Sequence, residues 1–249
     1  MKAPRVILAL AALFAASHTI AAELTVFAAA SLAEALKTLA PAYTAATGDT
    51  LRFNFGASGT LARQIKEGAP ADVIISADKL RLDQLTHGGL ILSGSRRTLL
   101  VNTLVLVVAA DNNTITTISD LTQPGLRHVA FGEPATVPAG TYAKDYLIKL
   151  KLWKPLQSKA VFLDNVRAVL ATVEAGNAEA GIVYKTDALS SKKIKIAVAV
   201  PLAEGPAITY PAAVVKTSKA PDAARKYVAW LADPEAQAVF ANYGFLPSP

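Results

Sequence analysis

Short apolar runs alternate with segments of helical periodicity along most of the chain. The first apolar run covers residues 24–27, and apolar residues then recur at spacings of three and four over residues 32–46. A short run rich in β-branched and aromatic residues predicts a strand, and the 3.6-residue period predicts a helix. Because strands and helices alternate with short connections, the chain is predicted to be an α/β protein whose mostly parallel sheets are flanked by helices.

The same alternation continues to the end of the chain and divides it into two lobes. A β-rich stretch over residues 98–109 contains no Gly or Pro and is predicted to run from one lobe into the other. Lobe I is predicted to comprise residues 23–103 and 213–249, and lobe II residues 104–212. Further strands are predicted at 51–55, 72–76, 129–132, 160–162, 180–184, 194–200 and 212–215, and further helices at 60–67, 79–86, 119–121, 141–149, 166–174 and 223–243.

The first 22 residues have the pattern of a secretory signal peptide. Lys2 and Arg5 precede an apolar core over residues 6–16, and small residues lead up to Ala22. The core is too short for a membrane-spanning helix, which needs about 20 apolar residues. We therefore expect export to the periplasm with cleavage near Ala22.

Charge and cysteine content narrow the classes of partner. The formal net charge is +6, but the basic residues are dispersed and 192–195 is the one dense cluster, with no aromatic residues interleaved. This favours a solvated loop over a nucleic-acid surface or a polybasic membrane patch. The absence of cysteine excludes disulfides, thiol catalysis and a lipid anchor on a thiol. We expect a monomer that binds no nucleic acid.

Four segments place small residues where a predicted helix begins. They are 30–31, 57–60, 137–140 and 164–166. The first amides of a helix have no partner within it and carry a partial positive charge, so several of them directed at one cleft bind an anion. In an open α/β sheet the loops that follow the strands share one edge, where ligands bind. Tyr184 ends a further strand at this edge.

Each of these residues also has a purely structural interpretation. Ser31 and Glu34 have the spacing of a capping box, and Ser58 and Thr60 are equally able to cap the next helix. Tyr184 is interpretable as a half-buried core aromatic with its hydroxyl at the surface. The anion site is favoured because all of these positions are expected at the same edge.

Enzymatic alternatives find less support. The sequence around Ser58 lacks the Gly-x-Ser-x-Gly spacing of a nucleophile elbow, and a triad would need His87 or His128 as its base. His87 is predicted in a loop after a helix and His128 at the start of a strand, the edge opposite Ser58. Neither histidine has a metal ligand at suitable spacing, and no phosphate-binding glycine motif is present.

Taken in order, six segments resemble the periplasmic molybdate-binding proteins of ABC importers, and the resemblance covers essentially the whole chain after residue 22. The segments are Ala28-Ala29-Ala30-Ser31-Leu32, Gly56-Ala57-Ser58-Gly59-Thr60-Leu61-Ala62-Arg63-Gln64-Ile65, Gly68-Ala69-Pro70-Ala71-Asp72-Val73, Val137-Pro138-Ala139-Gly140, Asn165-Val166-Arg167 and Gly181-Ile182-Val183-Tyr184.

This resemblance implies a two-lobed periplasmic binding protein fold of type II that closes over molybdate or tungstate. It implies that Ser31 and Ser58 bind the oxyanion through hydroxyl and amide, Ala139 and Val166 through their amides, and Tyr184 through its hydroxyl. Molybdenum is then bound only as the oxyanion, with no direct metal ligand and no cofactor. The implied partner is the membrane permease of an ABC importer. Several relatives are serine-rich around Ser58, whereas Ala57 and Gly59 flank it here.

A site built from donors favours particular oxyanions. Hydrogen phosphate carries a proton that needs an acceptor, and none of the five residues has a carboxylate. Sulfate is a bare dianion, so that only the size of the pocket excludes it. A sulfate-type receptor is therefore the nearest alternative, and an exported serine hydrolase the alternative from another class. If the anion bridges the lobes, the segments 102–104 and 210–213 are expected to bend as the hinge.

Overall fold

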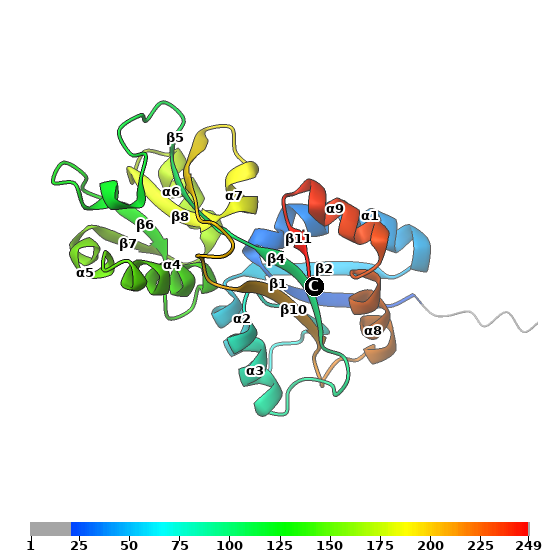
Figure 1. Ribbon diagram of the computed structural model, residues 1–249. Coiled ribbons are helices and arrows are strands. Elements are labelled where there is room, and N and C mark those ends of the chain that lie inside the picture. Colours follow the sequence, from blue (N-terminus) through cyan, green and yellow to red (C-terminus); the bar gives the residue numbers. More distant parts are fainter. Residues whose placement is uncertain (1–20, 249) are drawn as a thin grey trace, which may run out of the picture.

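The computed structural model describes residues 21–248 and consists of two lobes, each a β-sheet flanked by helices (Figure 1). The sheet of the first lobe has six strands in the order β11-β4-β10-β3-β1-β2. These strands are β1 (Glu23–Ala29), β2 (Thr50–Gly56), β3 (Val73–Ile75), β4 (Arg97–Asn102), β10 (Ile208–Val214) and β11 (Leu246–Pro247). The helices of this lobe are η1 (Ala30–Leu32), α1 (Ala33–Thr47), α2 (Ser58–Lys66), α3 (Lys79–His87), α8 (Pro221–Trp230) and α9 (Pro234–Asn242).

The second lobe has a five-stranded sheet in the order β7-β6-β8-β5-β9. Its strands are β5 (Leu104–Ala109), β6 (Val129–Gly132), β7 (Ala160–Leu163), β8 (Ala180–Tyr184) and β9 (Ile194–Ala199). Its helices are η2 (Ile118–Thr122), α4 (Pro138–Lys149), α5 (Trp153–Leu156), η3 (Gln157–Lys159), α6 (Val166–Glu174) and α7 (Lys185–Leu189). The α/β class predicted from the sequence is thus observed in both lobes.

Both sheets are mixed, whereas the sequence predicted mostly parallel ones. In the first lobe β1 pairs in parallel with β2 and β3, but β10 is antiparallel to β3 and β4. In the second lobe β6 pairs in parallel with β7 and β8, while β5 is antiparallel to β8 and β9. β5 and β10, the two strands that the chain enters from the other lobe, are antiparallel to both of their neighbours because the chain does not reach them through a helix on the same sheet.

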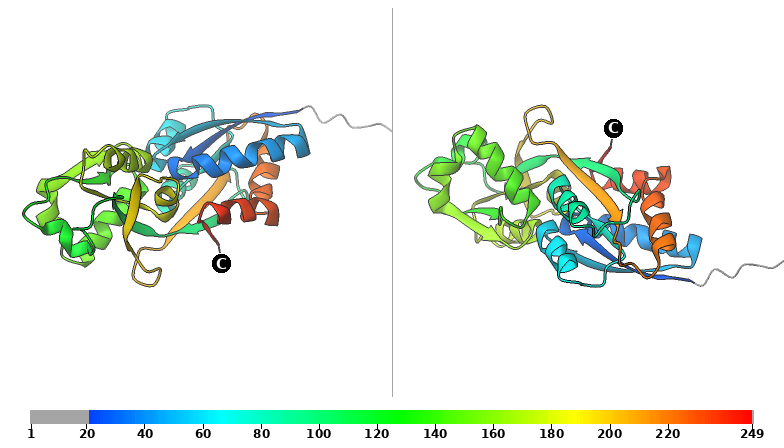
Figure 2. Two further views of the ribbon diagram at one scale, coloured as in Figure 1. Left: turned by 90° about the horizontal axis from the view of Figure 1, so that it is seen from above. Right: turned by 90° about the horizontal axis from the view of Figure 1, so that it is seen from below.

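The chain crosses between the lobes twice (Figure 2). The predicted β-rich stretch is two strands, β4 and β5, which Thr103 separates and which belong to different sheets. On the return, β9 lies in the second sheet and β10 in the first, so the chain crosses back between Ala199 and Ile208. The lobe boundary expected at residues 212 and 213 and the hinge segment expected at 210–213 both fall inside β10, so the return crossing lies earlier in the chain than predicted. Residues 208–212 are part of the first sheet.

Several helix starts differ from those predicted, and two of them have a clear local reason. α4 begins at Pro138 and not at residue 141, because proline is well suited to the first turn of a helix, where its missing N–H has no partner to lose. Residues 118–122 form a 3-10 helix whose start is held by reciprocal bonds between Thr117 and Asp120. The predicted helix at 119–121 is thus a tighter turn.

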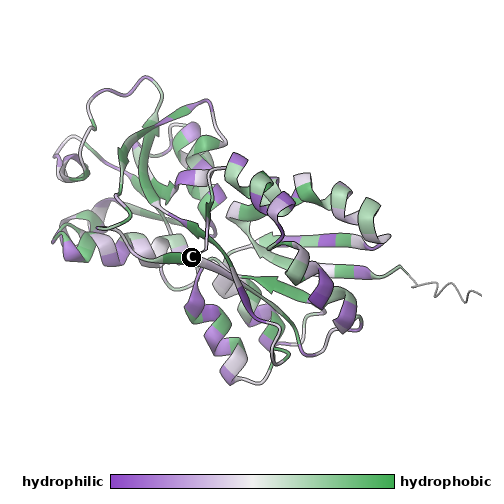
Figure 3. Ribbon diagram, turned by 45° about the vertical axis from the view of Figure 1, so that its right-hand side comes forward, coloured by the Kyte–Doolittle hydropathy of each residue, from purple (hydrophilic) through white to green (hydrophobic). Residues whose placement is uncertain are grey.

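Hydrophobic residues predominate on the inner strands of both sheets, as the colouring in Figure 3 shows. β5 and β8 are almost fully buried, as expected for strands covered on both faces. In the first lobe the aromatic rings of Tyr43 and Tyr227 pack edge to face at 4.9 Å. One large cluster of buried apolar side chains includes residues of both lobes, and a smaller cluster lies in the first lobe between α2, α3 and the sheet.

Residues 1–20, and with them most of the expected signal peptide, lie outside the described residues. Ala22 is part of the fold, where its amide donates to Asp49 at 2.8 Å and its carbonyl accepts from Thr50 at 2.8 Å. Between residues 21 and 248, none of the helices has the length and apolar character needed to cross a membrane.

Candidate functional site

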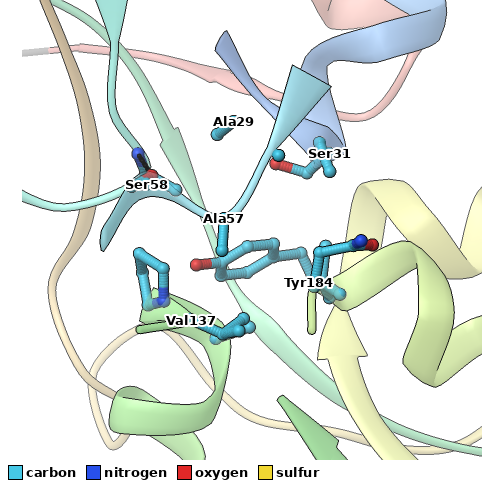
Figure 4. Close-up of a pocket in the computed structure, with 13 residues that line it drawn as sticks. Ala29, Ser31, Ala57, Ser58, Val137 and Tyr184 are labelled. Atoms are coloured by element: carbon cyan, nitrogen blue, oxygen red, sulfur yellow. Dashed lines mark hydrogen bonds between the residues drawn. The ribbon is translucent and has the colours of Figure 1, made fainter. Parts of the chain in front are cut away.

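A small cavity lies between the lobes, at the ends of the strands where the helices begin (Figure 4). Its space between protein atoms, including the mouth, is about 210 Å³. All five residues predicted to bind an anion line it. The complete lining is Ala29, Ala30, Ser31, Gly56, Ala57, Ser58, Ala77, Val137, Pro138, Ala139, Asn165, Val166 and Tyr184.

Four helix starts surround this cavity. Ser58 is the first residue of α2, Ala139 the second of α4 and Val166 the first of α6, while Ser31 lies in η1 directly before α1. Amides in these positions have no acceptor within their own helix. They therefore provide hydrogen-bond donors from both lobes, reinforced by the positive ends of the helix dipoles.

The two serines do not cap their helices, so the capping interpretation is wrong. Ala29 and Ala57 occupy the N-cap positions, and neither helix start has a side-chain cap bond. The Oγ of Ser31 instead lies 2.9 Å from the hydroxyl of Tyr210. The Oγ of Ser58 accepts from the amide of Ala77 at 2.9 Å. Both serines are buried, and the Oγ of each is fixed by a partner outside its own helix.

Tyr184 has a buried hydroxyl without a partner among the described residues. Only 2% of the residue is exposed, so the interpretation as a core aromatic with its hydroxyl at the surface is wrong. In Figure 4 its ring lies between Ala57 and Val137, with the hydroxyl among the lining residues. Burial raises the pKa of Tyr184 well above 10, so the hydroxyl keeps its proton. A buried unpaired hydroxyl costs free energy unless a ligand pairs with it.

None of the described residues that line the cavity has a charged side chain. Its polar groups are two serine hydroxyls, a tyrosine hydroxyl, the Asn165 side chain and backbone amides. The Oδ1 of Asn165 is already used, because it accepts from the amide of Ala168 at 3.0 Å and caps α6. The remaining groups that face the cavity act as donors, which suits a ligand that is rich in acceptors and negatively charged.

The two lobes contact each other beside the cavity. The amide of Gly59 donates to the carbonyl of Thr136 at 2.9 Å. A guanidinium N–H of Arg81 donates to the carbonyl of Ala135 at 2.7 Å. A Cβ on Gly59 would lie 2.5 Å from the Thr136 oxygen, closer than such atoms approach in proteins. The lobes are therefore closed on each other here, and glycine at position 59 permits the close approach.

Neither His87 nor His128 is among the residues that line the cavity. His87 ends α3, and His128 precedes β6, where its amide donates to Glu179 at 2.7 Å. Among the residues that the structure describes, Ser58 consequently has no histidine beside it to act as a general base. Within residues 21–248, no group of three His, Cys, Asp or Glu side chains is placed to hold a metal ion.

Sequence reasoning missed the residues that support the two serines, namely Tyr210 behind Ser31 and Ala77 behind Ser58. Ala77 follows β3, so its place at the same sheet edge was accessible from the strand prediction. Tyr210 lies in β10, 179 positions from Ser31, and no local pattern connects the two residues.

A buried carboxylate lies on α7, the short helix that directly follows Tyr184. Asp187 is fully buried, and the Nε of Arg167 lies 3.4 Å from its Oδ1. Burial raises the pKa of Asp187 from 3.8 to about 7 and outweighs the opposing effect of Arg167. The folded protein thus binds this proton more tightly than the unfolded chain, and stability is lost as the pH rises from about 4 to about 7.

We therefore expect the melting temperature of the ligand-free protein to fall by several degrees between pH 5 and pH 8 and to level off above that range. The Asp187→Asn variant, which has no proton to lose, should show a smaller fall. Asp145→Asn, on the exposed side of α4, is the matched control and should follow the parent protein. Thermal unfolding monitored by circular dichroism measures this. Equal pH profiles for the parent and Asp187→Asn would contradict the assignment.

Comparison with known proteins places the chain in a family. The family described as bacterial extracellular solute-binding protein matches residues 24–246, which is nearly the whole described fold. The chain is a bacterial extracellular solute-binding protein. The solute-binding fold explains why the cavity lies between two lobes, since such a site is formed by residues from both of them.

Individual solute-binding proteins match over most of their length. The chain is 39% identical to a putative ABC transporter substrate-binding lipoprotein of Bacillus subtilis, over 89% of this chain and 85% of the relative. It is 38% identical to the molybdate-binding protein ModA of Escherichia coli, over 90% of this chain and 88% of the relative. The periplasmic molybdate-binding protein of Azotobacter vinelandii has a similar structure, with a TM-score of 0.82 at 26% identity, covering 91% of this chain and 100% of that one. The resemblance found in the sequence motifs is confirmed.

Proposed function

We propose that this solute-binding protein captures molybdate, and equally tungstate, in the cavity between its lobes and delivers it to the membrane permease of an ABC importer. Ser31 and Ser58 bind the oxyanion through hydroxyl and amide, Ala139 and Val166 through their amides, and Tyr184 through its hydroxyl. The observation that carries the proposal is the unpaired, fully buried hydroxyl of Tyr184 in a cavity whose free polar groups are donors. The relationship to the ModA proteins supports the same ligand.

The available donors are sufficient for tight binding without a cationic side chain. A hydrogen bond to a charged group contributes about 1.5–3 kcal/mol net. Roughly seven such bonds exceed the roughly 8 kcal/mol of micromolar affinity, even after the costs of closure and desolvation. The anion bridges the lobes and stabilises the closed state, with the two crossing segments as the hinge.

The role is that of a receptor and not of an enzyme, and it needs no cofactor. The chain acts in the periplasm as a monomer and binds no nucleic acid. The Escherichia coli relative is named for molybdate binding, and the Bacillus subtilis relative for substrate binding in an ABC transporter. These names support the class of role proposed for this chain.

Export is expected to remove the first residues near Ala22. The basic start, the short apolar core and the small residues before Ala22 are the physical basis. Mass spectrometry of the soluble periplasmic fraction should give a mass that lacks about 22 residues. An intact Met1 or a membrane-bound product would contradict this expectation.

Titration calorimetry with four anions tests the proposed ligand. Molybdate and tungstate are expected to bind with Kd below about 1 μM, whereas phosphate should not compete. A thermal-shift panel gives the same ranking, because a ligand raises the melting temperature with the logarithm of its excess over Kd. Comparable phosphate affinity would reject the donor argument, and comparable sulfate affinity would move the protein to the sulfate receptors.

A further inference from the structure

Behind Ser31, a chain of buried hydrogen bonds connects the cavity with the crossing between the lobes. The Oγ of Ser31 lies 2.9 Å from the hydroxyl of Tyr210. The Nδ2 of Asn102 donates to the Tyr210 hydroxyl at 3.2 Å and to the Oγ1 of Thr186 at 2.9 Å. All four residues are at least 94% buried. Of these four residues only Ser31 lines the cavity, so the proposed anion contacts give the others no role.

The donors and acceptors in this series of hydrogen bonds are fixed at Asn102. Its Oδ1 accepts from the amide of Thr103 at 2.9 Å, which sets the orientation of the side-chain amide. Both Nδ2 hydrogens then donate, one to Thr186 and one to Tyr210. The Tyr210 hydroxyl accepts from Asn102 and has a single hydrogen of its own, and within the described residues its other partner is Ser31.

Tyr210 must therefore donate its hydrogen to Ser31. Burial raises the pKa of Tyr210 well above 10, so this hydrogen is present at every physiological pH. With one lone pair of Oγ occupied, the hydrogen of Ser31 is left free to point into the cavity. Turning the Ser31 hydrogen toward Tyr210 would leave the Tyr210 hydrogen buried without an acceptor, which is costly.

The hydroxyl of Ser58 is oriented in the same way by a different group. Its Oγ accepts from the amide of Ala77, and a backbone N–H can only donate. The hydrogen of Ser58 is thereby free for the cavity as well. Serine hydroxyls are donors or acceptors according to their surroundings, and here the surroundings of both serines make them donors.

We propose that Tyr210, oriented by Asn102, is a positioning residue that makes Ser31 a hydrogen-bond donor to the bound anion and so favours fully deprotonated oxyanions over protonated ones. This inference rests on the proposed function, because it concerns the anion in that cavity. A hydrogen phosphate ion must donate its own proton. To accept that proton, Ser31 must turn its second lone pair toward the anion and its own hydrogen away from it, and this hydrogen then loses its acceptor in a buried site.

A double-mutant cycle of Tyr210→Phe and Ser31→Ala, measured by calorimetry with molybdate, tests the coupling. Tyr210→Phe alone is expected to raise the molybdate Kd about tenfold, as expected for the loss of one oriented hydrogen bond. In the Ser31→Ala background the same change should have almost no further effect, because Tyr210 acts through Ser31. Additive effects in the cycle would overturn the proposal and leave Tyr210 a structural residue.

Direct titration with phosphate at high concentration gives the second readout. The phosphate Kd of Tyr210→Phe should not exceed that of the parent protein, so that the ratio of phosphate to molybdate Kd narrows about tenfold. A proportional rise of both constants would overturn the role in selectivity. Tyr227→Phe is the matched control, since its hydroxyl is also buried and lies in the core of the same lobe, and it should leave both constants unchanged.

Two further measurements separate a failure of the proposed role of Tyr210 from misfolding and from a failure of the proposed function. Thermal melts of the ligand-free variants establish folding, and if Tyr210→Phe does not fold, Asn102→Ala replaces it with the same expected direction. The molybdate titration of the parent protein tests the proposed function by itself. If that titration shows binding but the cycle shows no coupling, the function stands and the role of Tyr210 fails.

Discussion

The double variant Ser31→Ala, Ser58→Ala is expected to bind molybdate about 1,000-fold more weakly than the parent protein. Each serine is proposed to give a hydroxyl bond to a charged ligand, and the loss of about 2 kcal/mol at each position amounts to this factor. The two single variants should lose similar affinity. Each change also leaves a buried donor without its acceptor, the Ala77 amide in Ser58→Ala and the Tyr210 hydroxyl in Ser31→Ala.

Calorimetry on the two single variants and the double variant measures these losses. His87→Ala is the control and should bind like the parent, because His87 ends α3 and does not line the cavity. Full molybdate affinity in the double variant would show that molybdate does not bind in this cavity. Loss of molybdate binding in His87→Ala would contradict the proposed site and support the alternative in which His87 has a functional role.

Gly59→Ala is expected to lower the affinity for molybdate about 100-fold while leaving the ligand-free protein as stable as the parent. A Cβ at this position would lie 2.5 Å from the carbonyl oxygen of Thr136, which belongs to the other lobe. The lobes must separate to relieve this contact. About two charge-assisted bonds to the anion, each near 1.5 kcal/mol, are then lost or stretched.

The unchanged stability of the ligand-free form separates this effect from misfolding. Alanine is a better helix former than glycine, and the obstructing oxygen is not part of the lobe that contains α2. Gly125→Ala is the matched control, because its Cβ would meet no atom within 4 Å. Small-angle scattering with molybdate should show a larger radius of gyration for Gly59→Ala than for the parent. If Gly59→Ala and the parent protein have equal radii of gyration and equal molybdate affinities, the clash does not keep the lobes apart.

The site was largely predictable because its signals are local. A helix start, its small residues and the end of the preceding strand are adjacent in the sequence, and parallel β-α units bring such starts to one sheet edge. Ser58, Ala139 and Val166 could be placed together on this basis, and the cavity contains all of them. Ser31 and Tyr184 followed from the same rule.

The sheets and the residues behind the site could not be predicted in this way. β10 was expected to begin at residue 212, whereas the strand starts at Ile208 and accommodates Pro211 in an irregularity of its pairing with β4. Strand direction depends on which lobe the chain arrives from. The contact of Tyr210 with Ser31 joins residues 179 positions apart, and such a pairing is set by the fold as a whole.

The placement of Ala139 and Val166 at helix starts has a consequence for the evolution of such receptors. If these two residues contact the anion only through main-chain amides, anion binding does not depend on the chemistry of their side chains and only limits their size. Mutational drift at these positions is then tolerated as long as α4 and α6 begin where they do. Two of the five proposed contact residues are thus specified by the path of the backbone, and relatives with other small residues at these two positions are expected to retain the ligand.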